Sequence, residues 1–322
     1  MRRREFIAGL GGAAAWPLAV RAQQKKVWRI GYLHSGFWNS GSDVALFETF
    51  SETLKALGYV EGKNLIIDRR AAETRLDRLP ALASELVSLH PDVIMAVTTP
   101  AAIAAQRATS TIPTIIFPVT DPVRSGLVKS LAHPGGNITG LAFMSQDFTA
   151  KSIEVVHAIV PDAKKIAVLM TANPTHPPLY ELANSTAQLI GLSTVPVVAV
   201  TAADLDRAFQ EMGKANCDAL LNLPDAIQLA IVPLAATAKI PAVYQAIEFV
   251  EAGGLASYGP SLQSIFKRAA QYADKIFKGA DPADLPVEQP TTFELVLNLK
   301  TAKSLGLSIP EAVILRADKI IE

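Results

Sequence analysis

The chain has 322 residues, of which 50% are hydrophobic and 19% are charged. A chain of this length buries a sizeable core unaided and is long enough for two domains. Lysine plus arginine and aspartate plus glutamate both number 30, without a run of like charge, which argues against nucleic acid or an anionic membrane surface as a partner.

The first 22 residues are expected to be an export signal rather than part of the fold. Arg2, Arg3 and Arg4 precede an apolar stretch, Phe6–Val20, which is followed by the small residue Ala22. Arg3-Arg4-Glu5-Phe6-Ile7 also resembles the twin-arginine consensus, and an ordinary secretory signal with an arginine-rich start is the alternative. The apolar part is shorter than a membrane-spanning helix, so we expect the mature chain to be soluble.

Apolar strands alternate with helices in the first half of the chain. The expected strands are Val27–Leu33, Leu65–Asp68, Val93–Val97 and Thr114–Val119, with helices near Asp43–Leu57, Leu76–Leu89 and Ala101–Ala108. This alternation is typical of right-handed βαβ units on a parallel sheet. A short amphipathic helix, Val123–Ala132, and a further strand before Phe143 are expected next.

The same alternation begins again after Phe143. The expected helices are Thr149–Val160, Leu179–Ile190, Ala203–Ala215 and Ile227–Ala238, and the expected strands are Ile166–Met170, Val195–Val200, Ala219–Leu223 and Ala242–Tyr244. A long helix, Leu262–Lys278, precedes a proline-rich extended segment, a stretch at Phe293–Leu299 and two terminal helices. The sequence therefore predicts an α/β protein of two doubly wound parallel-sheet lobes, with the chain crossing between them more than once.

Sequence signs of catalysis are missing. The chain has no phosphate-binding Walker loop, no Gly-x-Ser-x-Gly elbow and no metal-ligand spacing among its five histidines. The single cysteine, Cys217, gives neither a disulfide nor a thiolate metal site. We therefore expect no cofactor, no metal and no enzymatic activity.

Polar residues follow the apolar strands in both halves of the chain. Because the carboxyl ends of parallel strands share one edge of a sheet, two facing lobes bring these loops to a common cleft. Thr98 and Thr99 precede Pro100, which suits the first turn of a helix whose free N–H groups bind a carboxylate. The alternative is that either threonine only caps that helix.

Five further residues are candidates for ligand contact, each with an ordinary structural alternative. Asp225 is placed to accept a ligand ammonium or to cap the next helix. Asp121 and Asn173 each precede a proline, where they bind ligand or form a turn. Ser35 directly follows the first strand, and Tyr244 either stacks on a ligand ring or belongs to the core.

Two aromatic residues, Phe37 and Trp38, lie in the loop after the first strand. They either form an apolar wall for the ligand or cover the sheet edge.

The motif TDPVRSGLVKSLAHPGGNITG, residues 120–140, resembles the signature of the ABC-transporter substrate-binding family, which includes periplasmic receptors for tryptophan and other aromatic amino acids. The stretch PAVYQAIEFVEAGGLASYGP and the C-terminal part from Lys267 to Glu322 agree with it. The resemblance implies a type I periplasmic binding fold, a Venus-flytrap with a three-stranded hinge. We expect residues 27–144 plus 260–287 in lobe 1 and residues 145–259 plus 288–322 in lobe 2.

The resemblance also implies a function. The expected role is an exported, periplasmic and monomeric receptor that closes on an amino acid or small carboxylate and delivers it to an ABC permease in the inner membrane. A ligand-sensing domain of a membrane regulator and a two-lobed enzyme acting in the cleft are the alternatives. A two-thiol racemase needs a second cysteine and a nucleotide-sugar enzyme needs a diphosphate-binding loop, and the sequence has neither.

Overall fold

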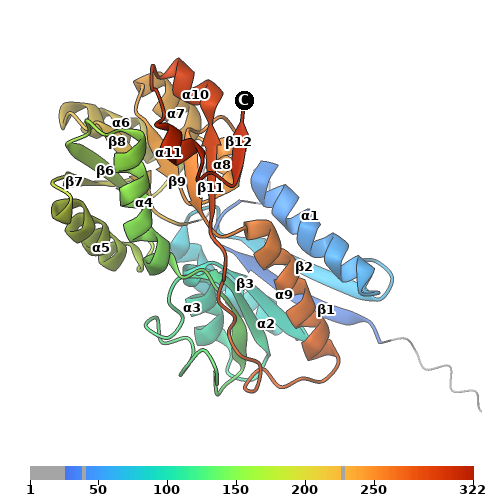
Figure 1. Ribbon diagram of the computed structural model, residues 1–322. Helices are drawn as coiled ribbons and strands as arrows, with labels where there is room; N and C mark the ends of the chain where they lie inside the picture. The colour runs from blue at the N-terminus through green and yellow to red at the C-terminus, as the bar shows by residue number, and fades with distance from the viewer. Residues whose placement is uncertain (1–25, 38–40, 226–228) are drawn as a thin grey trace, which may run out of the picture.

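Two α/β lobes make up the computed structural model, which describes residues 26–37, 41–225 and 229–322. Each lobe has a central sheet with helices on both faces, and the lobes lie one above the other in Figure 1. The predicted fold class is confirmed. The predicted export signal, residues 1–22, lies outside the described residues, as does Trp38. Within the described ranges, none of the helices combines the length and apolar character needed to cross a lipid bilayer.

The sheet of the first lobe is entirely parallel, in the order β2-β1-β3-β4-β5. Its strands are β1 (Trp28–His34), β2 (Leu65–Ala71), β3 (Val93–Val97), β4 (Thr114–Val119) and β5 (Ile138–Ala142). Successive residues of β1 face opposite sides. Tyr32 packs in the core beneath α1 (Gly41–Ala56) and α9 (Leu262–Phe277), whereas Leu33 packs in the core beneath α2 (Leu79–Ser88) and α3 (Thr99–Ala108).

The sheet of the second lobe has the order β12-β11-β10-β9-β8-β6-β7, in which β11 and β12 run against the other strands. Its strands are β6 (Lys165–Met170), β7 (Ser193–Val198), β8 (Ala219–Asn222), β9 (Ala242–Tyr244), β10 (Ala256–Gly259), β11 (Glu294–Asn298) and β12 (Lys319–Ile321). One face packs against α4 (Ser145–Ile159), α5 (His176–Leu189), α10 (Leu299–Ser304) and α11 (Glu311–Ile314). The other packs against α6 (Leu205–Lys214), α7 (Ile231–Ala238) and α8 (Ile247–Glu251).

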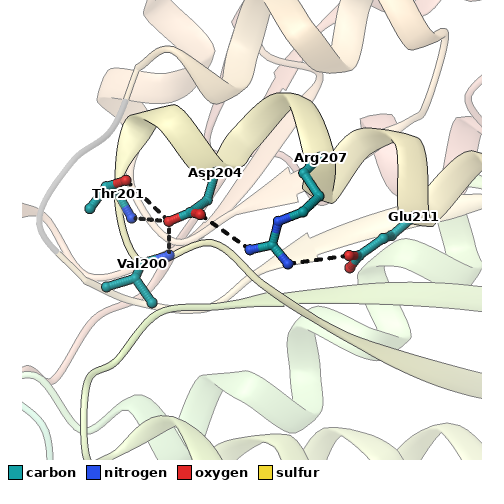
Figure 2. Close-up of polar contacts among 5 residues, drawn as sticks. All are labelled: Val200, Thr201, Asp204, Arg207 and Glu211. Atoms are coloured by element: carbon teal, nitrogen blue, oxygen red, sulfur yellow. Dashed lines mark hydrogen bonds and ion pairs between the residues drawn. The ribbon is translucent and has the colours of Figure 1, made fainter.

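The chain enters α6 through a capping arrangement that Figure 2 shows. The Asp204 carboxylate accepts hydrogen bonds from the backbone N–H groups of Val200, at 3.2 Å, and Thr201, at 2.9 Å. Arg207 links Asp204 to Glu211 along the helix surface. The hydrogen bonds from the Thr201 N–H, the Thr201 hydroxyl and Arg207 lower the pKa of Asp204. They fix where the chain turns after β7, an edge strand of the second sheet.

Three crossings connect the lobes: from β5 to α4, from β10 to α9, and from Glu288 to β11. Before the third crossing, Glu288 pairs with the first sheet, because its N–H donates to the Gly140 carbonyl and its carbonyl accepts from Ala142. Arg268 holds the Glu288 carboxylate with Nε at 2.6 Å and Nη2 at 2.5 Å, which lowers the pKa of that carboxyl. This fork anchors α9 to the returning chain.

Aromatic rings pack where the crossings meet. Phe143 contacts Phe148 edge to face, with ring centroids 5.2 Å apart, and Phe148 lies 5.9 Å from Phe293. Tyr258 adds a further contact to Phe293 at 6.2 Å. The four rings come from all three crossings, so the junction between the lobes is largely an apolar one.

One predicted element is wrong. Residues 123–132, expected as an amphipathic helix, form a series of turns in which the N–H of Leu127 donates to the Pro122 carbonyl. Gly126 adopts a φ of +70°, which a right-handed helix does not allow, and this interrupts the apolar periodicity. Three short elements, α8, β10 and β12, were not predicted.

A buried carboxyl group in α8 lacks the hydrogen bonds that usually offset the cost of burying a polar group. Glu248 is 9% exposed, and neither of its carboxylate oxygens has a hydrogen-bond partner among the described residues. Burial raises its pKa to about 7, and the carboxylates of Glu251, Asp43 and Glu294 act in the same direction. Since the pKa is higher in the folded chain than in the unfolded one, folding favours the protonated form. The amount by which buried Glu248 lowers the free energy of unfolding therefore grows as the pH rises from about 4.5 through about 7.

We expect Glu248→Gln to stabilise the fold in a pH-dependent way. At pH 8 the gain in the free energy of unfolding is about 3 kcal/mol, and it disappears at about pH 3, where wild-type Glu248 is protonated in both states. Thermal unfolding at both pH values measures it. Glu251→Gln, at an exposed neighbouring position with a surface ion pair to Lys319, serves as the control and changes stability by less than about 1 kcal/mol. A gain that is the same at both pH values contradicts this account.

Candidate functional site

A pocket of about 530 Å³, counted with its open mouth, lies where strand ends of the two sheets face each other. Both lobes contribute polar side chains to it, namely His34, Asp43, Thr98, Thr99, Thr120, Asn173, Asp225 and Gln245. Its apolar walls come mainly from the first lobe and the hinge, and comprise Leu46, Val97, Pro118, Phe143, Leu262 and Phe266, with Pro224 from the second lobe. No lysine or arginine is found among the described residues that line it. The size and lining suit a small organic molecule.

The first lobe offers a site for negative charge at the start of α3. Thr99 is the first residue of this helix and Pro100 follows it, so the first N–H groups have no intrahelical partner and the positive end of the helix dipole faces the pocket lining. The Thr98 hydroxyl lies 2.8 Å from that of Ser35. The Thr99 hydroxyl accepts the N–H of Thr120 at 3.1 Å. Hydroxyl groups and a helix N-terminus together can bind a carboxylate without a basic side chain.

Thr98 has a strained backbone. Its φ of +79° and ψ of 161° belong to a region that is almost exclusive to glycine, and Thr98 is β-branched. The strand end and the helix start on either side hold it there, with its N–H donating to the Phe117 carbonyl at 3.0 Å. Strain of this kind persists where the surrounding structure fixes a side chain in one place, here at the lip of the pocket.

The second lobe offers a negative charge. The Asp225 carboxylate follows β8 and accepts a hydrogen bond from the Thr171 hydroxyl. The amide nitrogen of Asn173 donates to the same carboxylate at 3.3 Å. The amide oxygen of Asn173 accepts from the Thr175 N–H at 3.0 Å, which fixes the orientation of the amide. The Asp225 carboxylate is therefore oriented at the pocket surface, where its oxygens can accept hydrogen bonds from a ligand cation.

His34 and Asp43 form a buried polar pair in the pocket lining. His34 Nδ1 accepts the N–H of Gly36 at 3.1 Å, and Nε2 lies 3.9 Å from the Asp43 carboxylate. Burial lowers the pKa of His34, although the Coulombic fields of Asp43 and Asp225 oppose this. The ring is therefore neutral at pH 7, with its hydrogen on Nε2 directed toward Asp43.

The structure brings five of the seven predicted site residues together. Thr98, Thr99, Asn173 and Asp225 line the pocket, and Ser35 lies beside it, bonded to Thr98 and sharing a small adjoining hollow with Asp225. That these residues bind ligand remains a prediction.

Asp121 and Tyr244 lie elsewhere in the described structure. The Asp121 carboxylate accepts the N–H of Arg124 at 2.9 Å, closing a turn at a separate interlobe hollow. Tyr244 is 1% exposed and stacks on Phe249, with ring centroids 4.7 Å apart, in the core of the second lobe. Of the two loop aromatics, Phe37 is half-buried and is not among the described residues that line the pocket.

Sequence reasoning missed several lining residues that stand next to predicted ones. His34 precedes Ser35, and Gln245 follows Tyr244, so these loops reach the pocket through residues directly beside the predicted ones. Strand alternation indicates that Tyr244 and Gln245 face opposite sides, but not which side carries the pocket. Asp43, Phe143 and Phe266 had been interpreted only as parts of a helix or of the hinge.

The family follows from comparison with known proteins. A family model described as ABC transporter substrate binding protein matches residues 40–321. The chain belongs to this family. This substrate-binding protein is 31% identical over 265 residues to the tyrosine-binding protein of Clostridioides difficile strain R20291, covering 80% of this chain and 75% of that one. The family resemblance inferred from the sequence is therefore confirmed.

Two solved relatives differ in how well they superpose. The structure of an ABC domain from Streptococcus pneumonia in complex with L-Trp is 27% identical, covers 91% of this chain and 99% of its own, and gives a TM-score of 0.81. The ligand-free, open structure of a substrate-binding protein from Clostridium difficile is 26% identical and covers 92% of this chain and 99% of its own, but its TM-score is 0.62. At similar identity and coverage, this substrate-binding protein thus superposes more closely on the L-Trp complex than on the ligand-free, open structure.

The strain at Thr98 can be measured by comparing two substitutions. Thr98→Gly and Thr98→Ala both remove the hydroxyl group bonded to Ser35, but only glycine adopts the observed φ and ψ without strain. We expect the glycine variant to be more stable than the alanine variant by about 1 kcal/mol, since relief of strain exceeds the extra entropy of the unfolded glycine chain. Chemical denaturation of the two variants tests this. An alanine variant that equals or exceeds the glycine variant in stability contradicts it.

Proposed function

We propose that this substrate-binding protein is the exported receptor of an ABC importer and that it binds a free amino acid with an aromatic side chain. The observation that carries the proposal is the pair of opposite poles in the pocket. One is the N-terminus of α3 with Thr98 and Thr99 on the first lobe, and the other is Asp225 on the second. An amino acid is the common small molecule that carries both a carboxylate and an ammonium group.

The two poles explain how binding is coupled to closure. The carboxylate of the ligand binds at the start of α3, and the ammonium group binds Asp225, so the ligand contacts both lobes at once. Only a closed arrangement provides both poles, and the ligand therefore stabilises it. We propose that the three crossings form the hinge, between lobe 1, residues 27–144 plus 260–287, and lobe 2, residues 145–259 plus 288–322.

The apolar walls favour an aromatic side chain. Phe143 and Phe266 line the pocket together with Leu46, Val97 and Leu262, and aromatic rings prefer such surroundings. The relative from Clostridioides difficile is a tyrosine-binding protein, and the Streptococcus structure contains L-Trp. Both support an aromatic amino acid as the ligand of this chain.

The remaining parts of the proposal concern location and partners. The arginine-rich apolar start of the sequence supports export to the periplasm, by the twin-arginine or the general route. The family supports a membrane permease as the partner that receives the ligand. We propose that the receptor acts as a monomer, without cofactor, metal or nucleic acid, and catalyses no reaction.

A thermal-shift series tests the ligand class. Residues 23–322, unfolded and refolded to remove carried-over ligand, are heated with each amino acid in turn. A ligand present at 100 times its Kd stabilises the protein by about 2.7 kcal/mol, which raises the Tm by a few degrees. We expect L-tyrosine, L-tryptophan or L-phenylalanine to give the largest shift. A series without any response to amino acids contradicts the proposal.

The ammonium contact is tested by Asp225→Asn. We expect the affinity for the preferred aromatic amino acid to fall about 100-fold, because a charge-assisted hydrogen bond contributes about 2 to 3 kcal/mol. The affinity for the corresponding des-amino acid should change little. Isothermal titration with both compounds measures the effect.

Asp121→Asn is the matched control, because Asp121 is a carboxylate in a strand-end loop that lies outside the pocket. The affinity of the Asp121→Asn variant for the preferred aromatic amino acid should equal that of the wild type. If both variants weaken binding equally, Asp225 has no specific role.

A further inference from the structure

His176 is a fully buried polar side chain close to the proposed ammonium site. It is the first residue of α5 and 0% exposed. Its Nδ1 lies 2.8 Å from the backbone nitrogen of Thr171, and its Nε2 lies 3.0 Å from the Pro224 carbonyl oxygen. Thr171 follows β6 and Pro224 follows β8, which are neighbouring strands. The imidazole therefore joins two strand-end loops of the second lobe.

The two contacts define the protonation state of the ring. A backbone N–H can only donate, so Nδ1 must present a lone pair to Thr171. A carbonyl can only accept, so Nε2 must carry the hydrogen that points to Pro224. His176 is thus a neutral imidazole in a single tautomer. A protonated ring would direct an N–H at the N–H of Thr171 and lose that hydrogen bond.

Both loops that His176 joins lead to Asp225. The Thr171 hydroxyl donates to the Asp225 carboxylate and accepts the N–H of Asn173 at 3.1 Å. Asn173 in turn donates its amide N–H to Asp225 at 3.3 Å. Pro224 is the residue directly before Asp225. Each bond of the imidazole therefore fixes the backbone of a residue that orients the carboxylate.

We propose that His176 is the positioning residue of the ammonium site: it holds the loops after β6 and β8 in the register that directs Asp225 into the pocket. This inference rests on the proposed function. His176 is not among the described residues that line the pocket, so it acts on the ligand only through Asp225 and Asn173. Its effect therefore falls on the ammonium group of the ligand rather than on the whole ligand.

A positioning role for His176 differs from a merely structural role because it affects ligands with an ammonium group selectively. A buried histidine that only fills the core affects the folding stability, and affects every ligand alike. A positioning residue changes the preference for an amino acid over its des-amino analogue. The quantity to measure is the Kd ratio, defined as the Kd of the des-amino acid divided by the Kd of the amino acid. The pairs are 3-indolepropionic acid with L-tryptophan and 3-(4-hydroxyphenyl)propionic acid with L-tyrosine.

Two variants of the refolded chain test it by titration calorimetry. His176→Phe keeps a ring and removes both hydrogen bonds, and we expect the Kd ratio to fall by about tenfold or more, since a hydrogen bond to a charged group is weakened. The affinity for the des-amino acid should stay within about threefold of the wild type. His176→Asn places an amide oxygen where Nδ1 stands, recovers the bond from Thr171 and restores part of the ratio.

A nitrogen-15 NMR spectrum of the wild-type imidazole supplies an independent readout. We expect His176 to show a hydrogen on Nε2 and none on Nδ1, with or without ligand. A hydrogen on Nδ1, or rapid exchange between tautomers, overturns the inference.

The outcomes distinguish the two proposals. Equal weakening of both ligands in His176→Phe, or an unchanged ratio, overturns the positioning role while leaving the proposed function in place. A wild-type protein that binds neither these four compounds nor L-phenylalanine overturns the proposed function, and the inference with it.

Discussion

Parallel pairing of strands is the constraint on which this structure depends. It places the carboxyl ends of the first sheet's strands, and of β6 to β10 in the second sheet, on one edge, and the helices that follow start there. Polar residues needed for turns and helix starts are thereby gathered at the same edge. When two such edges face each other, residues required for folding become available for binding. Thr99, which begins α3, and Asp225, which follows β8, belong to both groups.

The family signature serves the fold more than the pocket. Asp121 closes a turn, and Gly140 stands where any larger residue is impossible, because a Cβ atom would lie 2.0 Å from the Ile116 carbonyl oxygen. Asn137 donates to the Ile112 carbonyl at 2.8 Å and so joins the start of β5 to that of β4. The motif at residues 120–140 therefore helps to build the edge of the first sheet with which Glu288 pairs before the third crossing.

Much of the fold could be predicted from the sequence, because buried parallel strands form continuous apolar runs and their helices show a clear period. The elements that escaped prediction have other origins. The strand β10 is only four residues long, and β12 forms by pairing with β11 far from the pocket. The expected helix at residues 123–132 failed because local turn hydrogen bonds outweighed its apolar pattern.

The candidate site was predictable at the level of loops but not of side chains. A strand-end loop carries residues that face the pocket and residues that face the core, and periodicity does not indicate which is which. Tyr244 and Gln245 illustrate this, since the polar neighbour lines the pocket and the aromatic one packs on Phe249. His176 could not have been found from sequence, because its role depends on a contact with Pro224, which is 48 residues away along the chain.

The aromatic junction at the crossings has a thermodynamic consequence for the strength of binding. Phe143, Phe148 and Phe293 contact one another through their rings, so rotation of one lobe exchanges ring contacts at this junction instead of breaking hydrogen bonds between the rings. Such a junction adds little to the free-energy difference between the open and the closed arrangement. Apparent affinity equals intrinsic affinity multiplied by the fraction of molecules able to close, and a soft junction keeps that fraction high. The same softness lets a loaded receptor reopen without first unfolding any part of its sheets.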